Sequence, residues 1–270
     1  MNRRTVLSLV AGVALAGCGG SGSSGSPEPT ATGTAIPTAA GPEGLSVAGL
    51  KTPDTVPVNT LYGVVTEVEN PTETLRRFES GVSVQSGDEW REVDATLSGE
   101  VPAGETVRFG ARLPGFAFLG TYEVRVDATG ETGSVEAVPL DLGFGESFRT
   151  PRGLSVRVQG GTFASTYTGG GENTTARTPP ADRQWAVITV QVGNPTGEAA
   201  GFPPYGAFVA VVGDERYGVA VADADDSVTI PGDRRTVELP YLVPADATSE
   251  ELSVRWEPTY GERRTGAVWS

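Results

Sequence analysis

From Gly44 onward the chain consists of short runs rich in valine, threonine and aromatic residues, separated by Gly, Pro, Asn and Asp. The clearest run alternates Tyr122, Val124 and Val126 with charged residues, which gives a strand one apolar and one charged face. No long segment has the 3.6-residue period of an amphipathic helix. Strands about ten residues apart with turn signals between them predict antiparallel β-sandwiches, so the expected fold class is all-β.

The predicted strands fall into two sets, with a boundary expected between Val138 and Gly143. The first set comprises Leu45–Leu50, Leu61–Glu69, Phe78–Gln85, Arg91–Leu97, Thr106–Leu113 and Thr121–Ala128. The second set comprises Leu154–Val158, Gln184–Val192, Ala207–Val212, Arg216–Val221, Thr236–Val243 and Leu252–Trp256. We therefore expect two immunoglobulin-like antiparallel β-sandwich domains, over residues 44–140 and 141–270.

Two turn motifs recur in the same order in both halves of the chain. Residues 68–72 (VENPT) are echoed by residues 192–196 (VGNPT), and residues 101–107 (VPAGETV) by residues 230–237 (IPGDRRTV). Asn-Pro ends a strand because proline cannot donate to the ladder, and Pro-Gly makes the turn into the next strand. Any sandwich could use each motif singly, but their shared order and similar separation favour duplication of one domain.

Residues 142–257 resemble the telokin-like, immunoglobulin-type domain of unknown function found in bacterial and archaeal lipoproteins. The resemblance rests on Leu142–Phe148, Leu154–Val158, Trp185–Val192, Asn194–Thr196, Ile230–Gly232, Thr236–Leu239 and Tyr241–Pro244. The segment Val209–Ala222 departs from the family's pattern. The resemblance implies an extracytoplasmic sandwich and carries no catalytic residue over.

The sequence of residues 1–17 has the pattern of an export signal peptide. Arg3 and Arg4 precede an apolar run that is shorter than the about 20 residues needed to span a membrane. Leu15-Ala16-Gly17-Cys18 resembles a lipobox, which predicts cleavage before Cys18 and lipidation of that residue. Arg3-Arg4 also resembles a twin-arginine signal for export of folded proteins. We therefore expect a lipid-anchored protein on the extracytoplasmic face of the cell membrane.

Residues 18–43 form the expected tether. After Cys18, the stretch from Gly19 to Gly41 is almost wholly Gly, Ser, Thr, Pro and Ala. Such a segment buries too little apolar surface to offset the entropy of ordering, so we expect a disordered linker.

The chain has 34 acidic and 20 basic residues, a net charge of −14, and Lys51 is its only lysine. This composition resembles that of proteins from salt-loving organisms, although an ordinary acidic protein would also fit. The negative charge argues against a nucleic-acid partner. With Cys18 as the only cysteine, no internal disulfide can form, and with no histidine the commonest general base and metal ligand is absent.

The densest carboxylate cluster is Asp223, Asp225 and Asp226, whose oxygens could ligate Ca²⁺. The segment is not an EF-hand loop, since Val228 and Arg234 replace the expected glycine and glutamate. Acidic decoration of the surface is the favoured interpretation, and no cofactor is expected. Asn173 begins the Asn-Thr-Thr glycosylation sequon.

Two apolar segments, Leu113–Leu119 and Phe202–Tyr205, are candidates either for partner contacts or for packing between the two domains. No nucleophile stands in a recognisable catalytic motif, and no carboxylate pair stands out for hydrolysis, so an enzyme is not expected.

These observations predict an exported, lipid-anchored, non-catalytic cell-surface protein. Its sandwiches would bind a protein, a glycan or a solute in the envelope. One alternative is an accessory lipoprotein of a membrane transporter or respiratory complex. A metal-dependent or carboxylate enzyme is the less favoured alternative.

Overall fold

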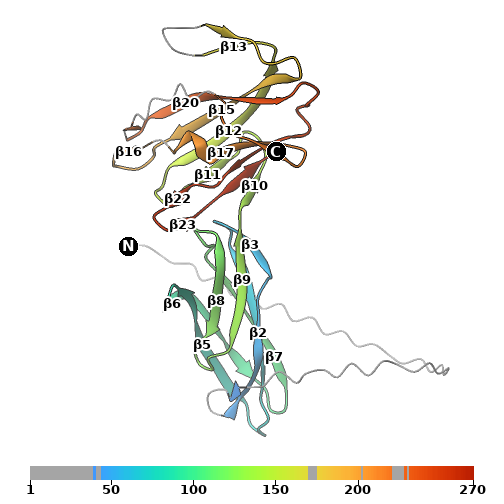
Figure 1. The fold of residues 1–270 in the computed structure, drawn as a ribbon. Coiled ribbons are helices and arrows are strands. Elements are labelled where there is room, and N and C mark those ends of the chain that lie inside the picture. Colours follow the sequence, from blue (N-terminus) through green and yellow to red (C-terminus); the bar gives the residue numbers. More distant parts are fainter. Residues whose placement is uncertain (1–38, 41–43, 170–174, 202, 221–227, 230) are drawn as a thin grey trace, which may run out of the picture. The chain divides into compact units, whose positions relative to one another are not determined.

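The computed structural model describes residues 39–40, 44–169, 175–201, 203–220, 228–229 and 231–270. Strands dominate these residues, which include no α-helix and a short 3-10 turn at Tyr205–Ala207. The prediction of an all-β sandwich fold is confirmed (Figure 1). No helix in the described ranges is long and apolar enough to cross a membrane.

The strands between Ala39 and Val138 pair only with one another and form what we call the first sandwich. Its four-stranded sheet has the order β1 (Ala39–Ala40), β2 (Ser46–Lys51), β4 (Tyr62–Glu69) and β7 (Thr106–Leu113). Its five-stranded sheet has the order β3 (Thr55–Pro57), β9 (Thr132–Val138), β8 (Gly120–Val126), β5 (Arg76–Ser86) and β6 (Glu89–Val101).

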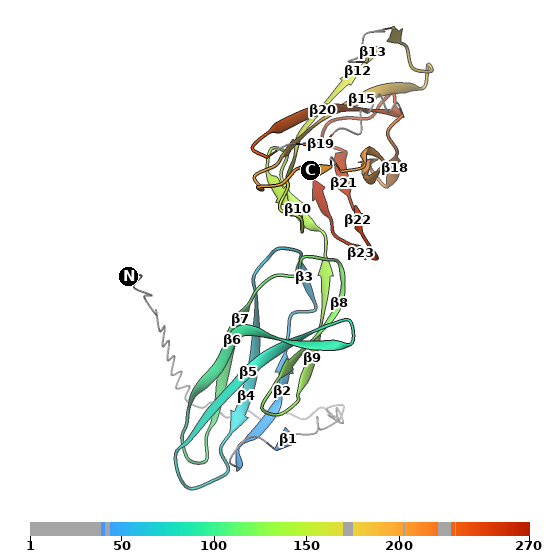
Figure 2. The ribbon, with the colours of Figure 1, turned by 90° about the vertical axis from the view of Figure 1, so that its left-hand side faces the viewer.

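The strands between Leu140 and Trp269 form the second sandwich. Its four-stranded sheet has the order β11 (Ser147–Arg149), β12 (Ser155–Ala164), β15 (Arg183–Gly193) and β20 (Arg234–Pro244). Its five-stranded sheet has the order β10 (Leu140–Leu142), β24 (Ala267–Trp269), β21 (Leu252–Trp256), β17 (Phe208–Val212) and β18 (Glu215–Tyr217). Strands β12, β15 and β20 run side by side in both views (Figure 2).

Three two-stranded ribbons extend the second sandwich. They are β13 (Tyr167–Thr168) with β14 (Ala176–Arg177), β16 (Ala200–Gly201) with β19 (Val228–Thr229), and β22 (Thr259–Tyr260) with β23 (Arg263–Arg264).

The two sandwiches share a four-plus-five arrangement, and each five-stranded sheet has one parallel edge pair. Strand β3 pairs in parallel with β9, and β10 pairs in parallel with β24, while every other pairing between named strands is antiparallel. The edge strands enter at different points, because β3 follows β2 whereas β10 precedes β11. The expectation of antiparallel pairing is wrong at these two edges.

The core of each sandwich is built from alternating residues that point between its two sheets. On β4, Tyr62, Val64 and Val68 are buried, and on β8 Val124 and Val126 are buried, as the alternation predicts. In the second sandwich the Trp256 ring lies edge-on to Phe148 and stacks on Phe208, each at 5.6 Å between ring centroids. Burial of each such side chain contributes about 1.5–3 kcal/mol.

The Asn-Pro-Thr turns have nearly identical contacts in the two sandwiches. Asn70 and Asn194 are both buried. Their side-chain amides donate to the carbonyls of Thr74 and Glu198, each at 2.8 Å. Their side-chain oxygens accept from the Thr72 and Thr196 amides, each at 3.1 Å. The side-chain hydroxyls of the same two threonines also donate to those oxygens, at 2.6 and 2.5 Å.

The turn that follows is held to the same asparagine in each sandwich. The Gly104 amide donates to the Asn70 carbonyl at 2.9 Å, and the Gly232 amide donates to the Asn194 carbonyl at 2.8 Å. The two recurring motifs therefore form the same hydrogen-bonded structure in both sandwiches. It connects the end of β4 to the start of β7 in the first sandwich, and the end of β15 to the start of β20 in the second.

The predicted strand ends differ from the observed ones by one or two residues in most strands, and by more at β6, β12 and β18. Strand β12 continues past the predicted Val158 to Ala164, through a bulge at Gly160 where φ is 125°. Strand β1 lies inside the predicted linker, because Ala39 and Ala40 add to the edge of β2. Strand β9 was not predicted, since its alternation of small and charged residues gives a weak pattern.

The segment Leu113–Leu119 is packed in the described structure. Phe116 is buried, and its ring stacks on Tyr122 at 4.1 Å. The Leu119 amide donates to the Arg264 carbonyl at 2.7 Å, and the Arg263 guanidinium lies 4.0 Å from the centre of the Phe118 ring. These contacts favour packing for this segment over a free partner surface. In Phe202–Tyr205, Phe202 lies outside the described residues, while Pro203 and Tyr205 are buried.

Candidate functional site

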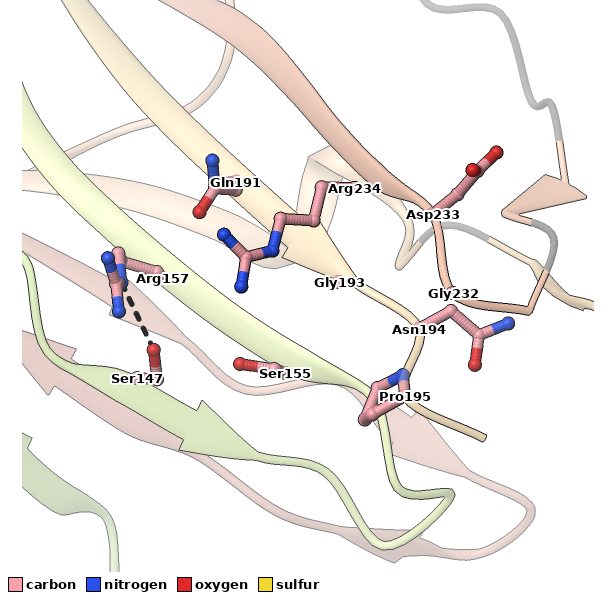
Figure 3. Close-up of a pocket in the computed structure, with 10 residues that line it drawn as sticks. All are labelled: Ser147, Ser155, Arg157, Gln191, Gly193, Asn194, Pro195, Gly232, Asp233 and Arg234. Atoms are coloured by element: carbon pink, nitrogen blue, oxygen red, sulfur yellow. Dashed lines mark hydrogen bonds between the residues drawn. The ribbon is translucent and has the colours of Figure 1, made fainter. Parts of the chain in front are cut away.

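The outer face of the β11-β12-β15-β20 sheet carries a hollow that we call the arginine hollow. Phe148, Val156 and Val192 point into the core of the second sandwich, so the residues that alternate with them point outward. The hollow has a volume of about 330 Å³ (Figure 3). It is lined by Ser147, Ser155, Arg157, Gln191, Gly193, Asn194, Pro195, Gly232, Asp233 and Arg234.

The strand register explains why these residues meet. One row across the sheet runs from Ser147 through Arg157 and Gln191 to Thr236. The next row on the same face runs from Arg149 through Ser155 and Gly193 to Arg234. Gly193 contributes no side chain at the centre, and this absence opens the hollow between Arg157 and Arg234.

Figure 3 shows the Arg234 side chain lying over the position of Gly193 and directed toward Arg157. Arg157 Nε donates to the Ser147 hydroxyl at 3.1 Å, which holds that side chain along the sheet. Asp233, at the rim, directs its carboxylate away from both guanidinium groups.

Neither Arg157 nor Arg234 forms an ion pair with any described carboxylate. Apart from Arg157 Nε, which is bonded to Ser147, their guanidinium donors are available in the hollow that both residues line, which suits them to bind an anionic group.

On the corresponding outer face of the first sandwich, around β4, charged side chains pair with one another. Glu67 on β4 accepts a hydrogen bond from Lys51 Nζ at 3.1 Å and one from Arg108 Nε at 2.8 Å. These hydrogen bonds, that from Lys51 first, lower the pKa of Glu67 below its ordinary value. Where the second sandwich has Gly193, the echoed motif of the first sandwich has Glu69.

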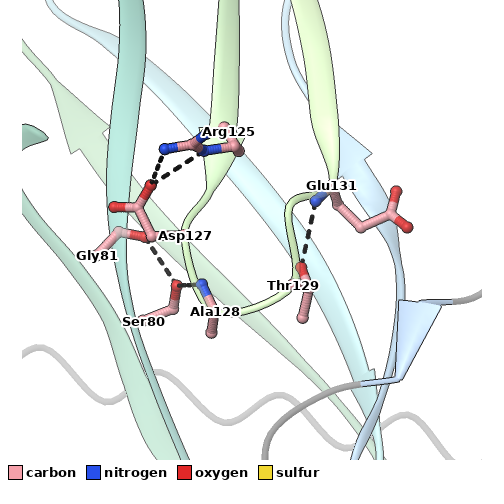
Figure 4. Close-up of polar contacts among 7 residues, drawn as sticks. All are labelled: Ser80, Gly81, Arg125, Asp127, Ala128, Thr129 and Glu131. Carbon is pink, nitrogen blue, oxygen red and sulfur yellow. Dashed lines mark hydrogen bonds and ion pairs between the residues drawn. The ribbon is translucent and has the colours of Figure 1, made fainter. Parts of the chain in front are cut away.

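A second polar cluster, in the first sandwich, is occupied by its own contacts (Figure 4). The buried Ser80 hydroxyl donates to the Gly81 carbonyl at 2.8 Å and accepts from the Ala128 amide at 3.0 Å. Arg125 pairs with Asp127 at 3.3 Å and lies 4.3 Å from the centre of the Trp90 ring. Because these groups satisfy one another, the cluster closes the β8–β9 turn.

The site residues expected from the sequence lie outside the described residues. They are Arg3, Arg4, Cys18, Asn173, Asp223, Asp225 and Asp226. Among the residues that are described, no group of three or more Cys, Asp or Glu side chains could hold a metal ion. The arginine hollow was not predicted. Its signal was present in the echo, where VGNPT has a glycine in place of the glutamate of VENPT.

No known family model matches the sequence, and no curated protein matches it. Among solved structures, an uncharacterised β-sandwich protein from Clostridium difficile is similar at a TM-score of 0.34 and 12% identity, over 49% of this chain and 93% of that one. Red sea bream transglutaminase is similar at a TM-score of 0.30 and 14% identity, over 84% of this chain and 31% of that one. At these scores neither structure bears on ligand or activity.

Proposed function

We propose that this chain is an exported, lipid-anchored, non-catalytic binding protein of the cell envelope, whose ligand docks in the arginine hollow. The observation that carries the binding role is the pair of outward arginines, Arg157 and Arg234, which have no described carboxylate partner and flank a glycine. In a chain with 34 acidic residues, carboxylates for pairing are abundant. Other described arginines also lack a carboxylate partner, but these two are directed over one hollow beside a glycine, which leaves their donors open to a shared ligand.

The export and anchoring part of the proposal rests on the sequence of residues 1–18. Arg3-Arg4, the apolar run and Leu15-Ala16-Gly17-Cys18 support a lipoprotein signal, and the composition of residues 19–41 supports a tether. For residues 142–257 we propose the telokin-like, immunoglobulin-type assignment as the finer description of the second sandwich.

Anchoring is tested by fractionating cells that express Cys18→Ser. This variant should leave the membrane fraction, because two lipid chains give stable anchoring and no helix of the described residues could replace them by crossing the membrane. Ser23→Ala in the tether is the matched control and should stay with the membranes. Membrane retention of Cys18→Ser at the wild-type level would defeat the lipoprotein assignment. A block of export by Arg3-Arg4→Lys-Lys would support the twin-arginine route.

The binding face is tested by co-sedimentation of the full chain carrying Cys18→Ser, which removes the proposed lipid anchor, with purified cell envelopes. This chain serves as the wild type of the comparison, and the variants below are made in it. Ser155→Trp would fill the hollow whatever the chemistry of the ligand, so it should reduce the bound fraction. Ser46→Trp is the control, because Ser46 pairs with Glu69 on the first sandwich as Ser155 pairs with Gly193 on the second. Equal binding by wild type and Ser155→Trp, or equal loss in both variants, would remove this face from the proposal.

A further inference from the structure

Resting on the proposed binding role, we infer that the arginine hollow recognises a tetrahedral oxyanion, a phosphate or sulfate group, held between Arg157 and Arg234.

The charge of the hollow favours an anion. Arg149, Arg157 and Arg234 lie on one face of one sheet, in two adjacent rows. The acidic groups nearest in register are Asp233 at the rim, directed outward, and Glu238, further along β20 on the same face. The face therefore has a local surplus of positive charge on a chain whose net charge is −14. An anion that enters gains charge-assisted hydrogen bonds without displacing an ion pair to any described carboxylate.

The spacing favours one small anion shared by both arginines. Arg157 and Arg234 are two strands apart, which is about 10 Å across the sheet, and two residues apart along it, which is about 7 Å. Both side chains are long and are directed over the same part of the sheet (Figure 3). A tetrahedral group has oxygens on opposite sides, so it can accept from two guanidinium groups that approach from different directions.

The floor of the hollow supplies small polar groups beneath the arginines. Ser147 and Ser155 present hydroxyls, and Gln191 presents an amide, all of which can donate to oxyanion oxygens. A Cβ on Gly193 would lie 3.7 Å from the Arg234 Cγ and 3.9 Å from the Ser155 Cβ, which are ordinary contacts. The backbone therefore tolerates a side chain at position 193, and the glycine is what keeps the space open.

The test is isothermal titration calorimetry of the full chain with inorganic phosphate and with sodium sulfate at low ionic strength. Arg157→Gln and Arg234→Gln should each weaken phosphate binding by about tenfold or more, because each removes charge-assisted hydrogen bonds. Arg157→Lys should bind phosphate with an affinity between those of the wild type and Arg157→Gln, since a lysine keeps the positive charge but cannot donate two parallel hydrogen bonds. Arg216→Gln, on exposed β18, is the control and should bind as wild type.

Gly193→Glu provides the sharpest variant. It places a carboxylate between the two arginines, as Glu69 stands in the first sandwich, and should abolish phosphate binding. Gly193→Ala adds a single methyl group within ordinary contact distances and should retain most of the affinity. Unchanged thermal unfolding of each variant confirms that the fold is intact.

A second arm compares the binding of the full chain carrying Cys18→Ser, which lacks the proposed lipid anchor, to vesicles of phosphatidylglycerol and to vesicles of phosphatidylcholine. Binding of inorganic phosphate or of the anionic vesicles, lost in both arginine variants, supports the inference and separates a free ion from a lipid headgroup. The inference is overturned if phosphate, sulfate and anionic vesicles all fail to bind, or if both arginine variants retain the binding.

If Ser155→Trp lowers envelope binding while these probes fail to bind, the proposed function stands without the oxyanion. If phosphate binds while Ser155→Trp leaves envelope binding unchanged, the oxyanion site stands and the envelope role falls.

Discussion

On the outer face of β4 in the first sandwich, Glu67 pairs with Lys51 and Arg108. On the matching face of β15 in the second sandwich, Gln191 and Gly193 lie between two arginines without described carboxylate partners. The Asn-Pro-Thr turns beside the two faces have nearly identical hydrogen bonds. The two faces therefore differ in their side chains, although the backbone structure beside them is the same. The charged groups of the first face are paired with one another, so they are not available to a ligand. The guanidinium donors of the second face have no described carboxylate partner, so they are available to bind one.

The largest expected effect tests whether the two sandwiches fold independently. A fragment of residues 139–270 keeps β10, which pairs with β24, and contains all strands of the second sandwich. It should fold cooperatively, because a domain of about 130 residues can bury roughly two-thirds of its chain surface. Circular dichroism and thermal unfolding measure this. A fragment that stays unfolded at every salt concentration, while the full chain folds, would show that the sandwiches share one folding unit.

The next effect compares the two buried asparagines. Asn70→Ala and Asn194→Ala should each lower the free energy of unfolding by roughly 2–4 kcal/mol, since each leaves buried carbonyl and amide groups without a partner. The two losses should be similar, because the corresponding hydrogen-bond distances around Asn70 and Asn194 agree within 0.1 Å. Calorimetric unfolding of both variants checks this. A large loss in one sandwich and none in the other would argue against a repeated structural device.

A smaller effect compares the turn glycines. Gly104 and Gly232 have φ values of 68° and 82°, in the left-handed region, and a Cβ at either would meet no atom within 4 Å. Gly104→Ala and Gly232→Ala should each cost about 1–2 kcal/mol through backbone strain alone. Gly197→Ala, which has equally open surroundings and no positive φ, should leave stability unchanged or slightly raised. If Gly197→Ala lost as much stability as Gly104→Ala and Gly232→Ala, backbone strain would not explain the effect.

The framework could be predicted from the sequence because it depends on local signals. Alternation predicted β7 at its observed limits, Thr106–Leu113, and the Asn-Pro and Pro-Gly motifs predicted where strands end. The parallel edges β3 and β10 could not be predicted, because three-residue strands carry no readable period. The buried asparagine side chains were also missed, since the motif was interpreted through the proline alone.

The arginine hollow escaped prediction for a different reason. Arg157 and Arg234 lie far apart in the sequence and meet through the registers of β12 with β15 and of β15 with β20. A single sequence does not give these registers, because a slip of two residues would keep every side chain on its face and still separate the two arginines. Aligning the two echoed motifs would have exposed the change from Glu69 to Gly193 as a difference in charge on one face.

The smallest expected effect exchanges the charge pattern of the two faces. Hydrogen bonds from Lys51 and Arg108 lower the pKa of Glu67 in the folded state. Its ionised form therefore stabilises the fold at pH values above the unfolded pKa, about 4.3, and this contribution is lost as the pH falls through the lower folded pKa. Glu67→Gln should thus lower the Tm slightly at pH 7, with the difference shrinking on acidification and in molar salt, where the Debye length is about 3 Å.

The reciprocal variant is Gln191→Glu, which places a carboxylate at the matching register position beside Arg157. It should gain the acid-dependent stability that Glu67→Gln loses, and it should weaken phosphate binding because the new carboxylate competes for Arg157. Differential Tm measurements between pH 3 and pH 7, at low and at molar salt, check both variants. A wild-type advantage over Glu67→Gln that grows on acidification would contradict the sign of this argument. A Gln191→Glu variant that binds phosphate as the wild type does would show that the hollow does not use Arg157 as its donor.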